Sequence, residues 1–223
     1  MSHPRRSALL ISFVLVTGYG LLCAPSVLFA QNLPTPPQAY VDTTYVPPTG
    51  QTIAVPDGGD FQAALDNAQP GDAIMLQAGA TYTGNFTLRN KPGSGWITIR
   101  TSAADASLPP AGTRITPAFS NVLPKVVTAT TNTPVLQAEA GAHHYRFIGV
   151  EFGVAAGVAV WNLIELGSGL ETSVAQLPHH IVFDRCYLHG TTTTNAIRGV
   201  ALNSAWSAII DSYFSDFHAV GYD

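Results

Sequence analysis

The chain repeats itself along its second half, and this self-similarity constrains the fold more than any other feature. Residues 143–152 align with residues 179–188 at an offset of 36, and a His-His pair opens both segments. A third copy, residues 208–215, follows at an offset of 27. A strand-like segment precedes each copy, and two of these, Ile164–Leu166 and Val200–Leu202, are again 36 apart. Such periods predict a solenoid in which each copy forms part of one coil and stacks on the next.

Alternation of apolar and polar residues assigns one face of each expected strand to the core. Cys186 falls on that face, so we expect it to be a packing residue, because a nucleophilic thiol needs exposure and an activating base. The aligned copies predict the inward columns Phe147/Phe183/Ile210, Val150/Cys186/Tyr213 and Phe152/Leu188/Ser215, with Ile164/Val200 and Leu166/Leu202 on the preceding strands.

A short amphipathic helix is expected before the repeats, over residues 60–68. Asp60 is a suitable N-cap, and Pro70-Gly71 ends the pattern before the apolar stretch Ile74–Leu76. One face of this helix would carry Phe61, Ala64, Leu65 and Ala68.

The stretch from Asp60 to Asp72, with the strand-like segments that follow it as far as Phe86, resembles the opening of right-handed parallel β-helix proteins of the pectin-lyase-like superfamily. In that superfamily a short amphipathic helix caps the open end of the solenoid, and the first strands follow a Pro-Gly-Asp turn. The resemblance implies an all-β fold, a right-handed parallel β-helix with a short N-terminal capping helix, over residues 51–223. A helix-turn-strand unit of an α/β domain is the alternative for this segment.

The first thirty residues have the layout of a secretory signal peptide. Arg5 and Arg6 precede an apolar run, and cleavage after Ala30 would release the remainder. A retained membrane anchor and a lipoprotein signal at Leu21-Leu22-Cys23 are the alternatives. We therefore expect a secreted protein, extracellular or periplasmic, with no membrane association after cleavage. Removal of the signal would leave Cys186 as the only cysteine, so no intrachain disulfide is expected.

Two further segments complete the expected organisation. Residues 31–50 contain two Pro-Pro pairs and suit an extended, Pro-rich linker. The β-helix is expected to be incomplete at its C-terminus, because no capping segment is visible between the third copy and Asp223.

Charge excludes one class of partner. Only 11% of the residues are charged, and the net charge is −4 with no Lys/Arg run, so nothing supplies the phosphate contacts of a nucleic-acid-binding protein. The low charge suits short strands joined by polar, uncharged turns.

Five residues are candidates for chemistry. Asp184 and Asp211 occupy one column of the predicted alignment and could hold a calcium ion or share a proton, or else form a structural turn ladder. His189 and Asp216 form a second aligned pair, with His218 two residues further on, and could orient a general acid or base or serve only in a turn.

The pairs His143-His144 and His179-His180 recur at matching positions. Metal binding is conceivable, but the spacing is not that of a known zinc motif, so a repeated turn residue is the favoured interpretation.

The resemblance implies a role on polysaccharide. Pectate-lyase-like enzymes use an Arg or Lys to remove the proton α to a uronate carboxyl group, usually with calcium held by Asp, whereas polygalacturonase-like enzymes use clustered Asp and a His. Neither local motif is clear here, so the sequence predicts a lyase-like or hydrolase-like protein without deciding that it is an enzyme, and no cofactor is certain. The alternatives are a non-catalytic carbohydrate-binding β-helix and a structural cell-surface β-helix.

Overall fold

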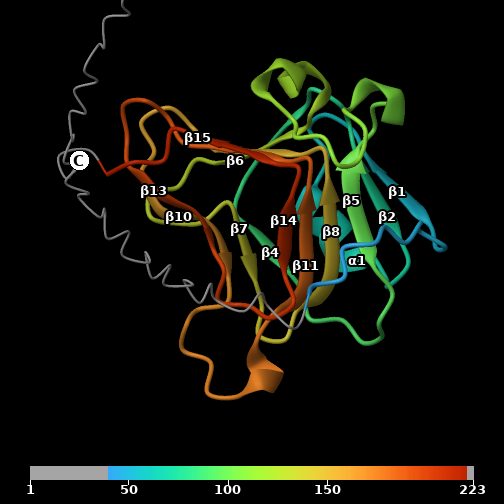
Figure 1. The fold of residues 1–223 in the computed structure, drawn as a ribbon. Helices are drawn as coiled ribbons and strands as arrows, with labels where there is room; N and C mark the ends of the chain where they lie inside the picture. The colour runs from blue at the N-terminus through green and yellow to red at the C-terminus, as the bar shows by residue number, and fades with distance from the viewer. Residues whose placement is uncertain (1–39, 220–223) are drawn as a thin grey trace, which may run out of the picture. The chain divides into compact units, whose positions relative to one another are not determined.

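The computed structural model describes residues 40–219 (Figure 1). The expected signal peptide, the first part of the Pro-rich segment and residues 220–223 lie outside this range. The described chain is mostly β-strand, with one α-helix, α1 (Phe61–Asn67), and the short 3-10 helices η1 (Asp105–Ser107), η2 (Pro117–Val122) and η3 (Val174–Gln176). Within residues 40–219, no helix is long and apolar enough to cross a membrane.

The strands form three sheets, and every pairing between named strands is parallel. The first sheet, at the centre of Figure 1, has the order β1 (Thr52–Val55), β2 (Ala73–Leu76), β5 (Ile97–Thr101), β8 (His143–Ile148), β11 (His179–Asp184) and β14 (Ala208–Ile210). The second sheet has the order β15 (Tyr213–Ser215), β12 (Tyr187–His189), β9 (Glu151–Val154), β6 (Lys125–Thr128) and β3 (Thr81–Thr83). The third has the order β13 (Ala196–Ala201), β10 (Val160–Leu166), β7 (Leu136–Ala138) and β4 (Phe86–Leu88).

From β2 onward the chain visits the three sheets in turn, and each sheet gains one strand per circuit. Parallel strands need such crossovers, because a hairpin turn joins only antiparallel neighbours. The mostly β composition and the parallel sheets agree with the predicted class and are consistent with a parallel β-helix.

The predicted offset between the first two copies is confirmed residue by residue. Phe147 pairs with Phe183, and Ile164 pairs with Val200. The fully buried rings of Phe147 and Phe183 lie parallel with their centroids 5.1 Å apart, and Phe152 meets both edge-on. The strand spacing of about 4.8 Å sets this separation, so the core is built as a stack of like residues.

The predicted alignment of the third copy is wrong by one residue. Phe183 pairs with Ile209 rather than Ile210, and Leu188 pairs with Phe214 rather than Ser215, so the offset is 26. Ile209 packs against the core. Because consecutive residues face opposite sides of a strand, either Ile of the Ile209-Ile210 pair fits an inward column by hydrophobicity alone.

Two other core predictions have different outcomes. Cys186 is fully buried, and this burial raises the pKa of its thiol to about 12, as suits a packing residue. Leu202 is wrongly placed in the core, because β13 ends at Ala201 and Leu202 is 52% exposed.

The predicted helix is confirmed. The Asp60 side chain accepts a hydrogen bond from the Ala63 backbone N–H at 2.9 Å, which satisfies one of the free donors at the helix start. Phe61 is buried against Phe86, with ring centroids 4.8 Å apart, so the apolar face of α1 covers the core beside β4.

Residues 40–50 form no helix or strand, but they lie against the sheets. The backbone N–H groups of Thr49 and Gly50 donate to the Gly71 carbonyl, and the Arg146 side chain donates to the Thr43 carbonyl at 2.8 Å. This segment therefore helps to form the surface over the first sheet.

The aromatic stack yields a stability prediction. We expect Phe183→Ala to lower the free energy of unfolding by about 3–5 kcal/mol, because it removes a fully buried ring from between coils. The measurement is urea denaturation followed by circular dichroism. Trp161→Ala is the matched control, since Trp161 is 61% exposed and its loss should cost under about 1 kcal/mol. Equal losses in the two variants would contradict the stack as a core element.

Candidate functional site

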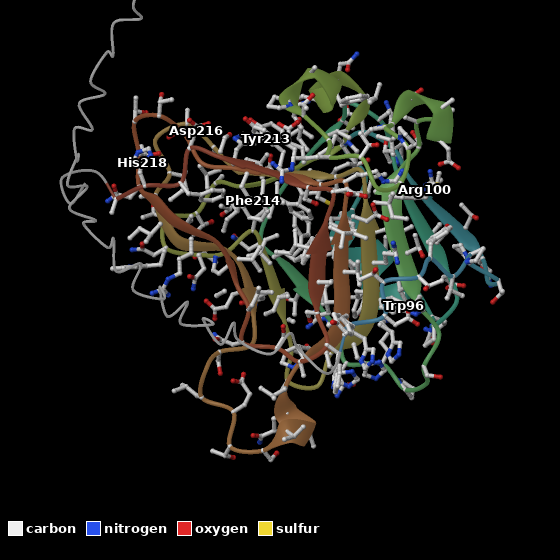
Figure 2. All side chains as sticks on the ribbon, in the orientation of Figure 1. Trp96, Arg100, Tyr213, Phe214, Asp216 and His218 are labelled. Carbon is white, nitrogen blue, oxygen red and sulfur yellow. The ribbon has the colours of Figure 1, made fainter. Side chains whose placement is uncertain are left out.

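A pocket of about 660 Å³ lies where β5, β8, β11 and β14 end. The loop that contains η1 forms one wall through Pro109, Pro110 and Gly112, and Tyr45 contributes another side. Figure 2 shows Arg100 at one end of β5 and Trp96 at the other, so this pocket belongs to the Arg100 end of the sheet. We call it the arginine pocket, after the charged residues that line it: Arg100, Arg146, Arg185, Asp105, Asp184 and Asp211.

The floor of the arginine pocket is a buried ion triad. Asp184 is only 3% exposed, and its Oδ2 accepts a hydrogen bond from Arg146 at 2.7 Å while its Oδ1 accepts one from Arg185 at 2.7 Å. The Arg146 guanidinium also lies 5.3 Å from the centre of the Tyr45 ring. With both carboxylate oxygens engaged, Asp184 is a structural anion that positions two guanidiniums.

Arg100 differs from the two floor arginines. It pairs with Asp105, whose side chain is 82% exposed, and such exposed pairs contribute little stability. The Nε–H groups of Arg100 and of Arg146 are both buried and have no hydrogen-bond partner among residues 40–219. Both arginines therefore have donor capacity that their present contacts do not use.

Asp211 lines the same pocket but is not stacked on Asp184, because Asp184 pairs with Ile210. The prediction of one aspartate column is wrong for the same one-residue reason as the core columns. The Asp211 carboxylate accepts a hydrogen bond from the Gly112 N–H at 2.6 Å, and its carbonyl accepts one from Ile115 at 2.8 Å. Asp211 thus anchors the loop that forms the pocket wall.

The aspartates of this pocket do not fit a calcium site. Calcium needs six to eight oxygen ligands, several of them from free carboxylates or carbonyls. Here both Asp184 oxygens face guanidiniums and one Asp211 oxygen faces a backbone N–H.

His189 has a different partner from the one predicted. It lies on β12, pairs in register with Ser215, and its Nε2 is 3.1 Å from the Glu151 Oε1. Asp216 is therefore not its aligned partner, although its charge acts on the imidazole. His218 does not continue β15 but bridges Ala196 in the antiparallel sense. Figure 2 shows Asp216 and His218 well away from Arg100.

The Glu151–His189 pair is a proton-binding group. Burial opposes protonation of His189 and is the largest single influence, but the hydrogen bonds to Glu151 and to the Gly190 carbonyl, with the nearby charges, outweigh it and raise the pKa of His189. Glu151 also accepts a hydrogen bond from the Ser120 hydroxyl, which ties η2 to the second sheet.

The two His-His pairs are brought together at the start of β8 and β11. Burial first, and then the neighbouring imidazoles, lowers the pKa of His144 to about 4. The same influences lower the pKa values of His143 and His179. The cluster is therefore neutral near pH 7 at these three rings.

The sequence interpretation missed Arg100, Arg146 and Glu151. Arg146 and Asp184 are 38 residues apart, which is the coil offset of 36 plus two, so they are diagonal neighbours on the outer face. The period-2 pattern that placed Phe147 inward therefore carried the signal for Arg146. Glu151 lies in the first aligned copy and is related to His189 by the same offset of 36 plus two, so the repeats carried its signal as well. Arg100 stands in a coil whose alignment the repeats did not reveal.

Comparisons with known proteins add the following. No protein-family model matches the chain, and a search of curated proteins finds no match. Among solved structures, the chain is similar to a mutant of the PL6 family alginate lyase AlyGC, with a TM-score of 0.46 and 16% identity. That match covers 80% of this chain and 22% of the lyase chain, so this chain spans under a quarter of the lyase's length.

The buried triad yields a second stability prediction. We expect Asp184→Asn to lower the free energy of unfolding by about 3–5 kcal/mol, because it leaves two guanidiniums buried without their counter-ion. Asp105→Asn, which breaks an exposed pair in the same pocket, should cost under about 1 kcal/mol. Urea denaturation of both variants measures the difference, and a cost below 1 kcal/mol for Asp184→Asn would show that the triad is not the structural floor.

The raised pKa of His189 predicts a pH dependence. We expect Glu151→Gln to lower that pKa, as followed by NMR titration of the imidazole. A raised folded-state pKa means that the pair's stabilisation is complete below the ordinary His value of 6.5 and is lost as the pH rises through the higher folded-state value. The stability gap between wild type and Glu151→Gln should therefore be largest in mild acid and shrink above neutrality. A gap that grows with pH would contradict the pairing.

Proposed function

We propose that the protein is a secreted β-helix protein that acts on acidic polysaccharide, and that the arginine pocket binds the carboxylate of a uronate residue. The observation that carries this proposal is the grouping of Arg100, Arg146 and Arg185 on one pocket, where the buried Nε–H groups of Arg100 and Arg146 have no hydrogen-bond partner among residues 40–219. Guanidinium groups match the planar geometry of a carboxylate and are the usual side chains for its recognition.

A uronate carboxylate would replace the Asp105 carboxylate as the ion-pair partner of Arg100. The present Arg100–Asp105 pair involves a largely exposed carboxylate, so replacing it costs little, whereas the floor triad is buried and stays in place. Once Asp105 is displaced, the remaining lining carries three arginines against two aspartates. The excess positive charge favours an anionic sugar over a neutral one.

The dimensions of the pocket support a saccharide. Its volume of about 660 Å³ is in the range of small-molecule sites, about 300–1,000 Å³. Tyr45 offers an aromatic ring at the margin, a surface against which sugar rings commonly pack.

The pocket favours elimination over hydrolysis as the chemistry. A glycoside hydrolase needs two carboxyl groups placed as acid and as base or nucleophile. In the arginine pocket, Asp184 and Asp211 already accept hydrogen bonds from arginines or from a backbone N–H, which leaves only Asp105 of this lining to be released by a bound uronate. Arginines beside a uronate carboxylate would instead neutralise its charge, which an elimination at the adjacent carbon requires.

A non-catalytic acidic-polysaccharide-binding protein, of the cell surface or free, is the second candidate. The observation in its favour is that each of the three guanidinium nitrogens of Arg185 donates a hydrogen bond to Asp184 or to the Pro109 carbonyl, as suits a positioning residue. The arrangement of the arginines therefore supports carboxylate binding directly, whereas it supports a basic residue for elimination only indirectly.

Two broader features belong to the same proposal. The circuit through three parallel sheets supports a closed, right-handed solenoid, in which ligands lie along the outer face. The charged and apolar pattern of residues 1–30 supports secretion to an extracellular or periplasmic space, where polysaccharides are available.

Binding and turnover can be tested separately with the full chain. We expect polyuronates to bind in calorimetry and neutral glucans not to bind. Arg100→Gln should weaken binding at least about tenfold, since a charge-assisted hydrogen bond contributes about 1.5–3 kcal/mol. Ultraviolet absorbance of unsaturated products and an assay of reducing ends would then separate elimination, hydrolysis and binding without turnover.

Arg198→Gln is the matched control, because Arg198 is an exposed arginine on β13 of the third sheet. It should bind polyuronate like the wild type. Equal affinity of wild type and Arg100→Gln, or equal affinity for neutral and acidic polymers, would remove the basis for the proposal.

A further inference from the structure

The opposite end of the first sheet carries an aromatic ladder that the arginine pocket does not involve. Trp96, His144, His180 and Trp206 hold equivalent positions just before or at the start of four successive strands, β5, β8, β11 and β14. Figure 2 shows Trp96 at the end of β5 opposite Arg100. The ladder is thus separate from the proposed polysaccharide site.

In the coils of β8 and β11, the backbone of the ladder places two adjacent imidazoles on the same side of the strand. Successive residues of a strand normally face opposite sides. His144 and His180 have φ values of 58° and 53°, in the left-handed region that non-glycine residues seldom adopt. As a result, the Nδ1 atoms of His143 and His144 are 2.7 Å apart, and those of His179 and His180 are also 2.7 Å apart.

Stacking between coils then assembles all four rings. His143 lies on His179 with centroids 4.8 Å apart, and His144 lies on His180 with centroids 4.7 Å apart and planes within 2° of parallel. One nitrogen from each of His144, His179 and His180 lies within 4.8 Å of the other two. The left-handed φ recurs at the next ladder position, Trp206 (φ 53°), so it belongs to the turn itself, and the convergent nitrogens are what distinguish the two histidine coils.

We propose that His144, His179 and His180 bind a divalent first-row transition-metal ion, with zinc as the representative ion. Imidazole nitrogen suits zinc, copper and nickel, whereas calcium and magnesium require oxygen ligands. Zinc–nitrogen bonds of about 2.0–2.1 Å place the ligand atoms of a tetrahedral site about 3.3 Å apart. Zinc binding would therefore require the Nδ1 atoms of His179 and His180, now 2.7 Å apart, to separate slightly. Any ligand nitrogens of the three histidines that lie further apart, up to 4.8 Å, would have to approach one another.

The proton balance of binding is simple. A hydrogen bond between the Nδ1 atoms of His179 and His180 requires one proton between them. Binding through both Nδ1 atoms requires that this proton move to the Nε2 of its ring, with no oxidation and no net loss of protons.

The fourth position of this site would be open. A pocket of about 290 Å³ beside His179 and His180 is lined also by Val174, Ala175, Ala205 and Trp206. Three histidines with an open position are the arrangement in which bound zinc retains a water or another small ligand.

Calorimetry of the full chain with zinc alone tests the site. We expect one ion per chain, a dissociation constant of about 1 µM or lower, and no saturable binding of calcium. His144→Asn and His180→Asn should each weaken zinc binding at least tenfold. Asn tolerates the left-handed conformation better than most residues, so these variants keep the backbone and remove the ligand.

His218→Asn is the matched control, since His218 lies outside the ladder and should leave zinc affinity unchanged. Should the ladder variants fail to fold, electron paramagnetic resonance of copper bound to the wild-type chain decides the matter. Coupling to at least two imidazole nitrogens is expected. Absence of saturable zinc binding, equal binding by ladder and control variants, or copper without imidazole coupling would each overturn the proposal and leave the ladder a packing feature.

Discussion

Parallel pairing between successive coils is the constraint on which the rest of this structure depends. Once Phe147 is paired with Phe183, every residue of β8 and β11 has a neighbour about 4.8 Å away and a fixed inward or outward direction. The same hydrogen-bonded register that stacks phenylalanines inside the protein stacks histidines outside it. The inward-facing and the outward-facing side chains therefore follow the same register, and a change of register would displace both the core stack and the histidine stack.

The outer face of the first sheet separates two kinds of chemistry. At one end, Asp184 holds Arg146 and Arg185 together, and the Nε–H groups of Arg100 and Arg146 have no partner among residues 40–219. At the other end, the stacked imidazoles of His144 and His180 lie between Trp96, which meets His144 edge-on, and Trp206. The charged end is the proposed site for an acidic polymer, and the imidazole end is the proposed site for a transition-metal ion. One sheet can carry both because each strand supplies a different outward residue at each end.

Much of the fold could be predicted from the residues alone. The Asp60 cap, the apolar face of the helix, the 36-residue offset and the burial of Cys186 all follow from local patterns. The third copy was misaligned because Ile209 and Ile210 are equally apolar, and only packing against Phe183 distinguishes them. That single residue of slip also misplaced Asp211 and Asp216 against their partners, since outward residues inherit the register of inward ones.

The sequence by itself determined the period, the core-facing residues of the two clearest coils and the start of the helix. The period is a repeat of residue types along the chain, and the other two depend on alternation within a strand or on the residues of one turn. Only the tertiary structure decided that Asp184 is held by Arg146, that His189 meets Glu151, and that four histidines converge. These contacts join residues more than thirty positions apart, across coils and against loops of irregular length. Their partners depend on register and loop path, which no local pattern of residues specifies.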